Sequence, residues 1–291
     1  MGTIQNFIRV CMLGAMTVST LLAAQPSITE PDQLSATLAP IVSLEFDDVS
    51  PTLWKATPRS LARSLNEGRT WLPVRLPSWV QGNILSFKVS AGRAKTLYVV
   101  VVGSGVLSSR DGGRSWVARN HGLPGGTVVA LAPHSAQPRT IYAYIDGKGI
   151  FRSHNAGAVW RLVNHGPHEP VSQLAHSTMP SETGTGWLFA ATRTGVHRAM
   201  DCFCGWKRAG QLALGSRAVS SDAALPERIY AAAGDGLFIS PDGGDHWTRM
   251  RSPVAPITAL ASTPSGRLYG AIRGNVIRSN DRGVTWEYID R

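Results

Sequence analysis

Helix signals are scarce in this sequence of 291 residues. Charged residues make up only 16% of it. No long stretch has Ala, Leu, Glu and Lys at the spacing of an amphipathic helix. The sequence contains 30 Gly and 18 Pro instead, and they separate short apolar runs. This pattern predicts many short strands joined by tight turns, in one large all-β domain or in two smaller domains.

Runs of basic residues are also missing, although the formal net charge is +10. No stretch contains five consecutive Lys or Arg residues, and aromatic and basic residues do not interleave as they do in known nucleic-acid modules. We therefore expect no nucleic-acid partner. The charge suits either a soluble protein with a basic rim or a module that binds an anionic partner.

The first 24 residues carry one charge, Arg9, followed by an apolar stretch from Val10 to Ala24. This stretch of about 15 residues is shorter than the roughly 20 that span a bilayer. The segment 1–24 is therefore predicted to be a signal peptide, which exports the chain to the periplasm or the extracellular space. An uncleaved anchor is the alternative, because Leu22 occupies a position where a small residue is preferred.

Cysteine is rare, with three residues in the whole chain. Cys11 lacks the small-residue context of a lipoprotein signal, so we expect no lipidation there. Cys202 and Cys204 could form a local disulfide in an oxidising compartment, or they could remain two thiols in a turn. No pair of histidines lies near them in the sequence, so they make a poor metal site. No metal and no cofactor is expected.

One pattern recurs six times: Ser, then Asp or Asn two positions later, usually Gly two after that, and Trp three after the Gly. The fourth copy is degenerate, with Ala199 in place of Ser and Phe203 in place of Gly. Successive Trp residues lie 39 to 46 positions apart. The acid or amide and the Trp of each copy are Asn66 and Trp71, Asp111 and Trp116, Asn155 and Trp160, Asp201 and Trp206, Asp242 and Trp247, and Asp281 and Trp286.

Each repeat contains four short strand signals. In the last repeat they are Ile257–Ala261, 267–272, Asn275–Ser279 and 285–289. Four antiparallel strands at a period of about forty residues are typical of a propeller blade. The predicted fold is an all-β, six-bladed β-propeller of four-stranded antiparallel blades.

The propeller is predicted to cover residues 41–291. Residues 25–40 are expected to form a linker, or to donate an additional edge strand. Six complete repeats leave no spare strand, so we expect the ring to close by packing of the last sheet on the first.

The recurring turn has a structural role: Ser and Asp oxygens accept backbone N–H groups, Gly supplies a positive φ, and Trp anchors the outer strand.

The repeated Ser-x-Asp-x-Gly-x-x-Trp motif resembles the BNR/Asp-box repeat superfamily over about residues 41–290. That group includes sialidases, sortilin-type receptors, xyloglucan-cleaving glycosidases and photosystem II assembly/stability factors. The Arg-Ile-Pro motif of sialidases does not occur, and the nearest first-blade stretch is 57–60. The assembly-factor type is the most similar, although its members resemble seven-bladed rings. The resemblance implies a non-catalytic, exported binding or assembly module; the alternative is a sialidase-type glycoside hydrolase.

The loops between the second and third strands would form the partner-binding channel mouth of such a propeller. They carry Arg, which suits bidentate binding of carboxylates or phosphates. The expected ligand is a protein or another anionic group, with a carbohydrate as a further option. A membrane-associated partner is compatible with export, and we expect a monomer. The residues of this predicted mouth are Arg59, Lys148, Arg193, Arg273, Asp146 and Asp235.

Two other interpretations of these loop charges are ordinary solvated turns and an arginine-based, sialidase-like pocket. The loops that lead from one blade to the next add further polar and aromatic residues. Two histidines three positions apart on a Pro-containing loop lack the rigid spacing of a helix-borne metal site, so these loops are expected to form a polar rim. The residues concerned are Trp79, His121, His165, His168 and Glu169.

Overall fold

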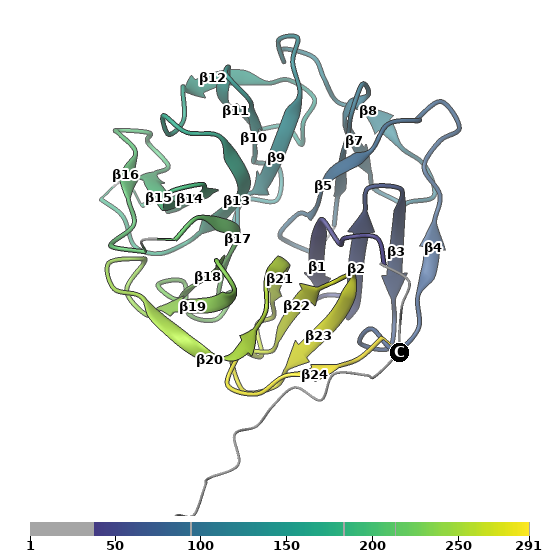
Figure 1. The fold of residues 1–291 in the computed structure, drawn as a ribbon. Helices are drawn as coiled ribbons and strands as arrows, with labels where there is room; N and C mark the ends of the chain where they lie inside the picture. The colour runs from purple at the N-terminus through teal and green to yellow at the C-terminus, as the bar shows by residue number, and fades with distance from the viewer. Residues whose placement is uncertain (1–37, 94, 183, 213, 291) are drawn as a thin grey trace, which may run out of the picture.

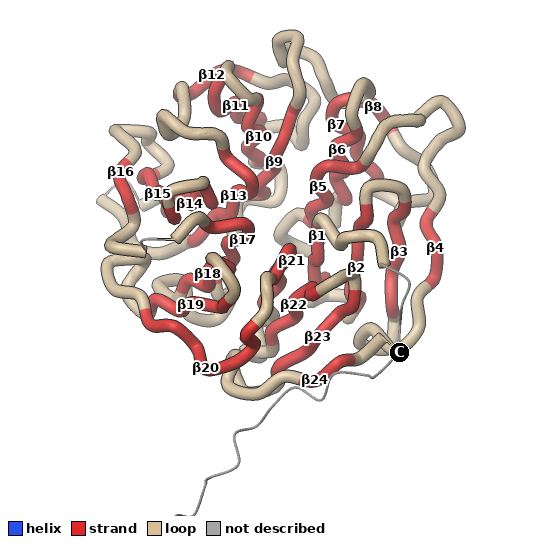
Figure 2. The backbone as a smooth tube through the Cα atoms, in the orientation of Figure 1, coloured by secondary structure: helices blue, strands red, loops and turns tan. Residues whose placement is uncertain are grey.

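The computed structural model describes residues 38–93, 95–182, 184–212 and 214–290. Six four-stranded antiparallel sheets are arranged as blades around a central axis (Figure 1). The described residues form only strands, turns and loops (Figure 2). The predicted all-β, six-bladed propeller is therefore confirmed.

Every blade uses four strands that follow one another in the sequence and pair in that order. Blades 1 and 2 are β1 (Ser43–Asp47), β2 (Thr52–Thr57), β3 (Ser60–Ser64), β4 (Leu72–Val74), and β5 (Ile84–Val89), β6 (Leu97–Val101), β7 (Gly105–Ser109), β8 (Val117–Ala118). Blades 3 and 4 are β9 (Val128–Pro133), β10 (Ile141–Ile145), β11 (Gly149–Ser153), β12 (Arg161–Asn164), and β13 (Val171–Ser177), β14 (Trp187–Thr192), β15 (Gly195–Met200), β16 (Lys207–Arg208). Blades 5 and 6 are β17 (Ser216–Ser221), β18 (Ile229–Ala233), β19 (Gly236–Ser240), β20 (Thr248–Val254), and β21 (Ile257–Ser262), β22 (Leu268–Ile272), β23 (Asn275–Ser279), β24 (Glu287–Tyr288).

The first strand of each blade lies nearest the axis, and the fourth lies at the rim (Figure 1). The second strands β6, β10, β18 and β22 are buried along their whole length. Such continuous burial requires a covered surface on both sides of the sheet, and the neighbouring blades provide it. Their Val, Ile, Ala and Tyr residues are suited to this packing. The hydrophobic core is therefore distributed between blades and leaves the axis itself available for polar groups.

The ring closes where blade 6 meets blade 1. Ile41, Leu44 and Leu53 of the N-terminal side pack in one cluster with Tyr269 and Val276 of blade 6. All four strands of blade 1 come from one stretch of chain, as do those of blade 6. The ring thus closes by packing of sheet faces, as predicted, and no blade is shared between the two ends.

The turn between the third and fourth strands, here called the repeat turn, is held by the predicted residues in five blades. In blade 2, Ser109 Oγ donates to Asp111 Oδ1 at 2.8 Å, and the amide of Gly113 donates to Ser109 Oγ at 2.8 Å. The amide of Ser115 donates to Asp111 Oδ1 at 2.9 Å. The corresponding Ser and Asp or Asn bond in the same way at Ser64 and Asn66, Ser153 and Asn155, Ser240 and Asp242, and Ser279 and Asp281.

The fourth repeat turn is built differently. Ala199 has no hydroxyl group, so the serine-centred bonds cannot form. The sequence pattern predicted that Asp201 holds its own turn, and this prediction is wrong. The buried carboxylate of Asp201 accepts a hydrogen bond from the hydroxyl of Tyr142 in blade 3. A disulfide joins Cys202 to Cys204 across the same turn, with their Cα atoms 5.5 Å apart.

The predicted signal peptide, residues 1–24, lies outside the described residues. Of the predicted linker, 25–40, only residues 38–40 are described, and they form no strand. A search of the described part of the chain finds no helix with the length and hydropathy needed to cross a membrane.

Candidate functional site

The loops of a propeller blade emerge alternately at the two ends of the ring. The repeat turns and the loops between first and second strands share one end, which we call the repeat-turn end. The loops between second and third strands and those between blades share the other, which we call the hairpin end. The predicted mouth residues lie at the hairpin end, so the question is whether the fold gathers them around the axis.

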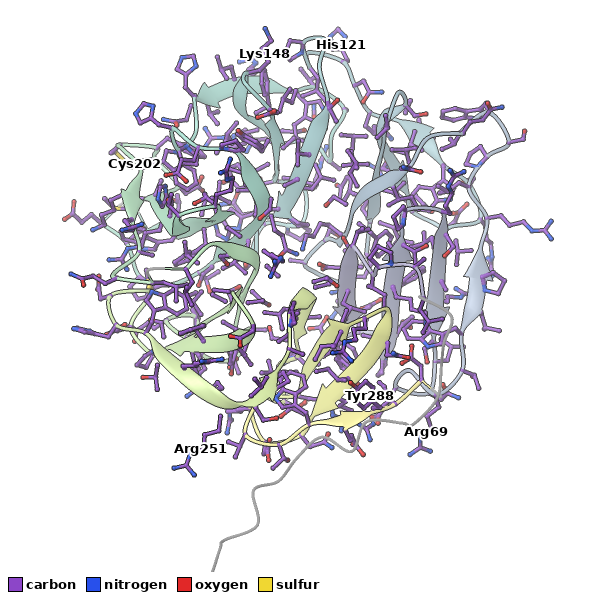
Figure 3. All side chains as sticks on the ribbon, in the orientation of Figure 1. Arg69, His121, Lys148, Cys202, Arg251 and Tyr288 are labelled. Atoms are coloured by element: carbon purple, nitrogen blue, oxygen red, sulfur yellow. A yellow bond between two sulfur atoms is a disulfide. The ribbon has the colours of Figure 1, made fainter. Side chains whose placement is uncertain are left out.

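The structure spreads the predicted mouth residues over separate blades. Arg59 borders a hollow of about 450 Å³ that also contains Arg75. Arg193 borders another of about 370 Å³, together with Arg217. Lys148 lies at the outer edge of the ring (Figure 3). Of five hollows formed by the described residues, none contains two of the six predicted side chains.

The acidic members of the predicted mouth have partners within their own blades. Asp235 forms an ion pair with Arg249 at 2.7 Å. Asp146 accepts a hydrogen bond from the hydroxyl of Tyr144 at 3.3 Å. The hairpins stand outside the first strands, and each strand spacing adds about 4.8 Å to the distance from the axis. Convergence of these charges on the channel therefore remains a prediction.

The axis opens at the hairpin end into a hollow of about 270 Å³. It is lined by the beginnings of the first strands, including Ser43, Gln173 and Thr258. Its only charged lining residue among those described is Arg217, which donates to the carbonyl of Gly234 at 2.9 Å. This end of the channel is therefore polar and weakly charged.

The repeat-turn end of the axis holds a second hollow, of about 260 Å³, lined by all six blades. Lys88 lies 2.6 Å from Glu45, and Lys95 lies 2.7 Å from Asp48. Burial raises the pKa of Glu45, although Lys88 acts in the opposite direction. Glu45 and Asp48 thus each have a lysine counterion, and Lys88 offsets only part of the cost of burying Glu45.

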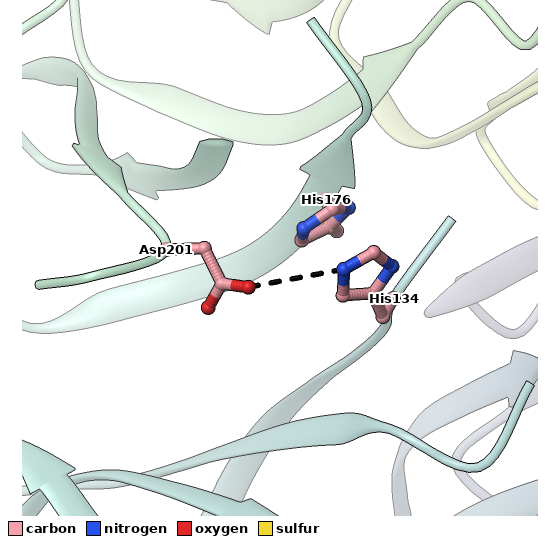
Figure 4. Close-up of side chains that lie close together, drawn as sticks. All are labelled: His134, His176 and Asp201. Atoms are coloured by element: carbon pink, nitrogen blue, oxygen red, sulfur yellow. Dashed lines mark ion pairs between the residues drawn. The ribbon is translucent and has the colours of Figure 1, made fainter. Parts of the chain in front are cut away.

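Three buried side chains, His134, His176 and Asp201, lie together between blades 3 and 4 (Figure 4). The two imidazole rings stack with their centroids 3.9 Å apart, and His134 Nε2 is 3.8 Å from a carboxylate oxygen of Asp201. Burial lowers the pKa of His134 and lowers that of His176 to about 3. Both rings are therefore neutral at pH 7.

The hydrogen bonds of the two histidines argue against a metal centre. His134 Nδ1 accepts the amides of Ala136 and Gln137 at 3.0 and 3.2 Å. His176 Nδ1 accepts the amide of Ser135 at 3.2 Å. A neutral imidazole whose Nδ1 is an acceptor carries its proton on Nε2, and a metal ligand usually donates from its second nitrogen. Both Nε2 atoms are buried without a hydrogen-bond partner among the described residues. In this tautomer each Nε2 carries a proton and offers no lone pair to a cation.

Asp201 also brings together Tyr142 and Arg152, the residue types of a sialidase-like nucleophile site. Tyr142 is fully buried, and burial raises the pKa of its hydroxyl, with the Asp201 carboxylate acting in the same direction. Arg152 lies 3.5 Å from Asp201. A nucleophilic tyrosine needs access to substrate and a lowered pKa. This trio has neither property, so it links two blades and offers no catalytic hydroxyl.

A strongly basic hollow lies away from the axis, at the repeat-turn end of blades 2 and 3. This hollow, which we call the basic groove, measures about 680 Å³. It is bordered by Arg93, Lys95, Arg110 and Arg139. Among the described residues, Asp47 is the one carboxylate that lines it. Among the described residues, no carboxylate lies within ion-pair distance of the three exposed guanidinium groups.

The basic groove was not among the predicted sites, because the predicted mouth lies at the hairpin end and the groove at the repeat-turn end. Arg93 and Arg139 lie in loops between first and second strands, and Arg110 directly precedes the acid of the second repeat turn. Arg110 follows Arg93 by 17 positions, and Arg139 follows Arg110 by 29. In a propeller, the corresponding loops of neighbouring blades lie side by side at one end of the ring. The three arginines could therefore have been grouped from the sequence by comparing the loops at both ends.

Comparison with known proteins gives no match to a family model and no match to a curated sequence. Solved structures do match. A GH74 enzyme of Niastella koreensis has a TM-score of 0.61 and 15% identity over 85% of this chain, which spans about half (46%) of the enzyme. A GH74 xyloglucanase of Xanthomonas campestris has a TM-score of 0.61 and 17% identity over 88% of this chain and 48% of the enzyme.

YCF48 bound to a D1 peptide has a TM-score of 0.57 and 20% identity, with 91% of this chain and 88% of YCF48 covered. A chain of a nidogen/laminin complex has a TM-score of 0.60 and 14% identity, with 78% of this chain and 88% of that chain covered. At such identities these likenesses show the fold and leave function to the site. The chain is therefore a β-propeller whose fold is similar to that of the YCF48 and GH74 propellers.

Proposed function

We propose that this propeller is a non-catalytic module that binds an acidic segment of a partner protein through the basic groove. The observation that carries the proposal is the set of three exposed arginines, Arg93, Arg110 and Arg139, around one hollow. Unpaired guanidinium groups on one surface repel each other and favour an anionic occupant. Their planar donors match carboxylates in a bidentate manner.

The size of the basic groove supports a peptide over a single ion. A hollow of about 680 Å³ lies in the range of sites for drug-sized ligands. The matching structure of YCF48 contains a bound D1 peptide, and the nidogen/laminin structure is a complex of proteins. These two structures support a protein-binding role, which we extend to this chain as a monomeric, exported protein.

The glycosidase alternative has less support from the described residues. Glycoside hydrolysis needs two carboxyl groups on either side of a sugar. Glu45 and Asp48 border the axial hollow, and both are held by lysines. Tyr142 and Asp201 are buried away from solvent. We therefore assign binding to the basic groove and no catalysis to the axial hollow.

A binding titration tests the proposal. The full chain is mixed with a fluorescent Glu-rich peptide, and with the same peptide in which Gln replaces each Glu. The triple variant Arg93→Gln/Arg110→Gln/Arg139→Gln removes three charges from the basic groove. A matched control, Arg59→Gln/Lys148→Gln/Arg193→Gln, removes three charges from the hairpin end.

We expect at least a tenfold loss of affinity in the groove variant, no change in the control, and no binding of the Gln peptide. A loss of affinity in the control variant alone would place the binding site at the predicted mouth. That result would contradict binding at the basic groove. An equal loss of affinity in both variants would show that net charge alone attracts the peptide and would overturn the groove. Hydrolysis of a fluorogenic sialoside or aryl glycoside would contradict the non-catalytic proposal and support the glycosidase alternative.

A further inference from the structure

The fourth repeat turn lacks the backbone conformation that the other five share. In those five, two consecutive residues after the acid or amide have positive φ, as in Glu67 (60°) with Gly68 (96°) and Ala156 (61°) with Gly157 (82°). In the fourth turn Cys202 lacks a positive φ, and the positive values occur at Phe203 (55°) and Gly205 (142°), which are not consecutive. Left-handed backbone is unfavourable for a bulky residue and must be held by its surroundings.

The Cys202–Cys204 disulfide takes the place of the missing hydrogen bonds. It spans the turn around Phe203, with a Cα separation that lies in the ordinary range for a disulfide. Both cysteines are exposed to solvent. A thiol can therefore reach the sulfur atoms without unfolding of the blade. Exposed disulfides that hold a costly backbone conformation are the labile ones.

The turn is connected to the interface between blades 3 and 4. The ring of Phe203 meets that of Tyr142 edge-on, with centroids 5.9 Å apart. The carbonyl of Phe203 accepts from Asn164 Nδ2 at 3.4 Å, and Asn164 Oδ1 accepts from Trp206 Nε1 at 2.9 Å. Opening of the disulfide would thus loosen one blade boundary and leave the five serine-held turns intact.

We propose that Cys202 and Cys204 form a thiol–disulfide exchange site whose reaction partners are dithiols. A thiolate of the dithiol attacks one exposed sulfur, the S–S bond breaks, and the other cysteine leaves as a thiolate that takes up a proton. The second thiol of the partner then attacks the mixed disulfide and releases the second cysteine. Two electrons and two protons pass from the dithiol, which becomes a disulfide, to the cysteine pair. The reaction is reversible and needs no other co-reactant.

Redox titration of the full chain tests this site. The variant Cys11→Ser removes the third cysteine, and the protein is equilibrated in glutathione buffers of graded ratio and with dithiothreitol. Free thiols are then counted by a maleimide mass tag. We expect a reversible transition between zero and two thiols within the range set by glutathione. A pair that stays oxidised in excess reduced glutathione, or reduced in excess oxidised glutathione, would overturn the proposal.

Two variants at one position test the role of the turn conformation. Phe203→Gly removes the cost of the positive φ, so it is expected to make the disulfide harder to reduce by about tenfold in the exchange constant. Phe203→Ala keeps a Cβ and removes only the ring, so its constant is expected to stay near that of the parent. Equal constants for Gly and Ala would show that the backbone does not control the exchange.

Hydrogen exchange adds a structural readout. Reduction is expected to raise exchange in the amides of residues 201–206 and to leave the second repeat turn, 109–116, unchanged. Uniform protection in both redox states would contradict the connection between the disulfide and the blade boundary. The variant Cys202→Ser/Cys204→Ser is expected to show the exchange pattern of the reduced protein.

Discussion

Lys55 Nζ lies 3.0 Å from Asp290 Oδ2, and this ion pair joins the second strand of the first blade to the end of the chain. Asp290 Oδ1 also accepts the amide of Val276 at 2.6 Å, and Lys55 lies over the ring of Trp71 at 4.1 Å. Burial nevertheless raises the pKa of Asp290, so the loss of solvation outweighs the attraction of Lys55. The pair fixes where the ring closes and contributes little net stability.

Breaking one side of this pair is predicted to cost more than removing both charges. Lys55→Met leaves a buried carboxylate unpaired and should lower the free energy of unfolding by about 2 kcal/mol, less than for a fully buried pair. The double variant Lys55→Met/Asp290→Asn keeps the acceptor for Val276 and should recover most of that loss. Urea denaturation of the parent, the two single variants and the double variant gives the coupling free energy between Lys55 and Asp290. Additive losses would show that the two side chains act independently.

The repeat turns allow a matched pair of substitutions. Ser109→Ala removes the hydroxyl that accepts the amide of Gly113, so it is expected to lower stability by about 1 kcal/mol. Ala199→Ser restores the consensus residue in the fourth turn, but Asp201 is directed at Tyr142 and cannot accept from it. We therefore expect no gain in stability from Ala199→Ser. Urea midpoints measure both, and a gain at position 199 would show that Asp201 can return to its own turn.

The repeat turns also show what sequence could and could not predict. The bonds of Ser109, Asp111 and Gly113 are local, so their spacing alone predicted them, and six copies predicted the ring. Asp201 was assigned to its own turn because its partner, Tyr142, is 59 positions away and belongs to another blade. The basic groove combines loops of two blades in the same way. Residue spacing predicts contacts within a repeat, whereas contacts between repeats depend on the packing angle of the blades.

Acid is predicted to destabilise the protein through the stacked histidines of blades 3 and 4. The pKa of His176 is about 3 in the folded chain, against 6.5 as its ordinary value, because burial disfavours the charged ring. The unfolded chain therefore binds a proton that the folded chain does not. This contribution to stability is complete above pH 6.5 and is lost as the pH falls toward 3. The loss is about 2 kcal/mol between pH 6.5 and 5.

His134 titrates in the same direction, since burial lowers its pKa too, although the nearby Asp201 opposes this. The variant His176→Asn keeps an acceptor near the Nδ1 position and cannot gain a proton. Its unfolding free energy should be lower at pH 7 and should depend less on pH between 6.5 and 5. Urea titrations at both pH values check this. An unchanged pH dependence in the variant would assign the acid sensitivity to other groups.

The basic groove offers a prediction of gained affinity. Within the described part of the chain, Asp47 is the one carboxylate that lines the groove. Its Oδ1 accepts the amide of Val49 at 3.0 Å. Asp47→Asn keeps this acceptor and removes a negative charge, which leaves Lys95 with Asp48 as its remaining partner. An acidic peptide should then bind about two- to threefold more tightly at low salt, and the difference should shrink as ionic strength rises. Fluorescence anisotropy at two salt concentrations measures both effects. Weaker binding by Asp47→Asn would show that the carboxylate helps to orient the groove, contrary to a purely electrostatic role.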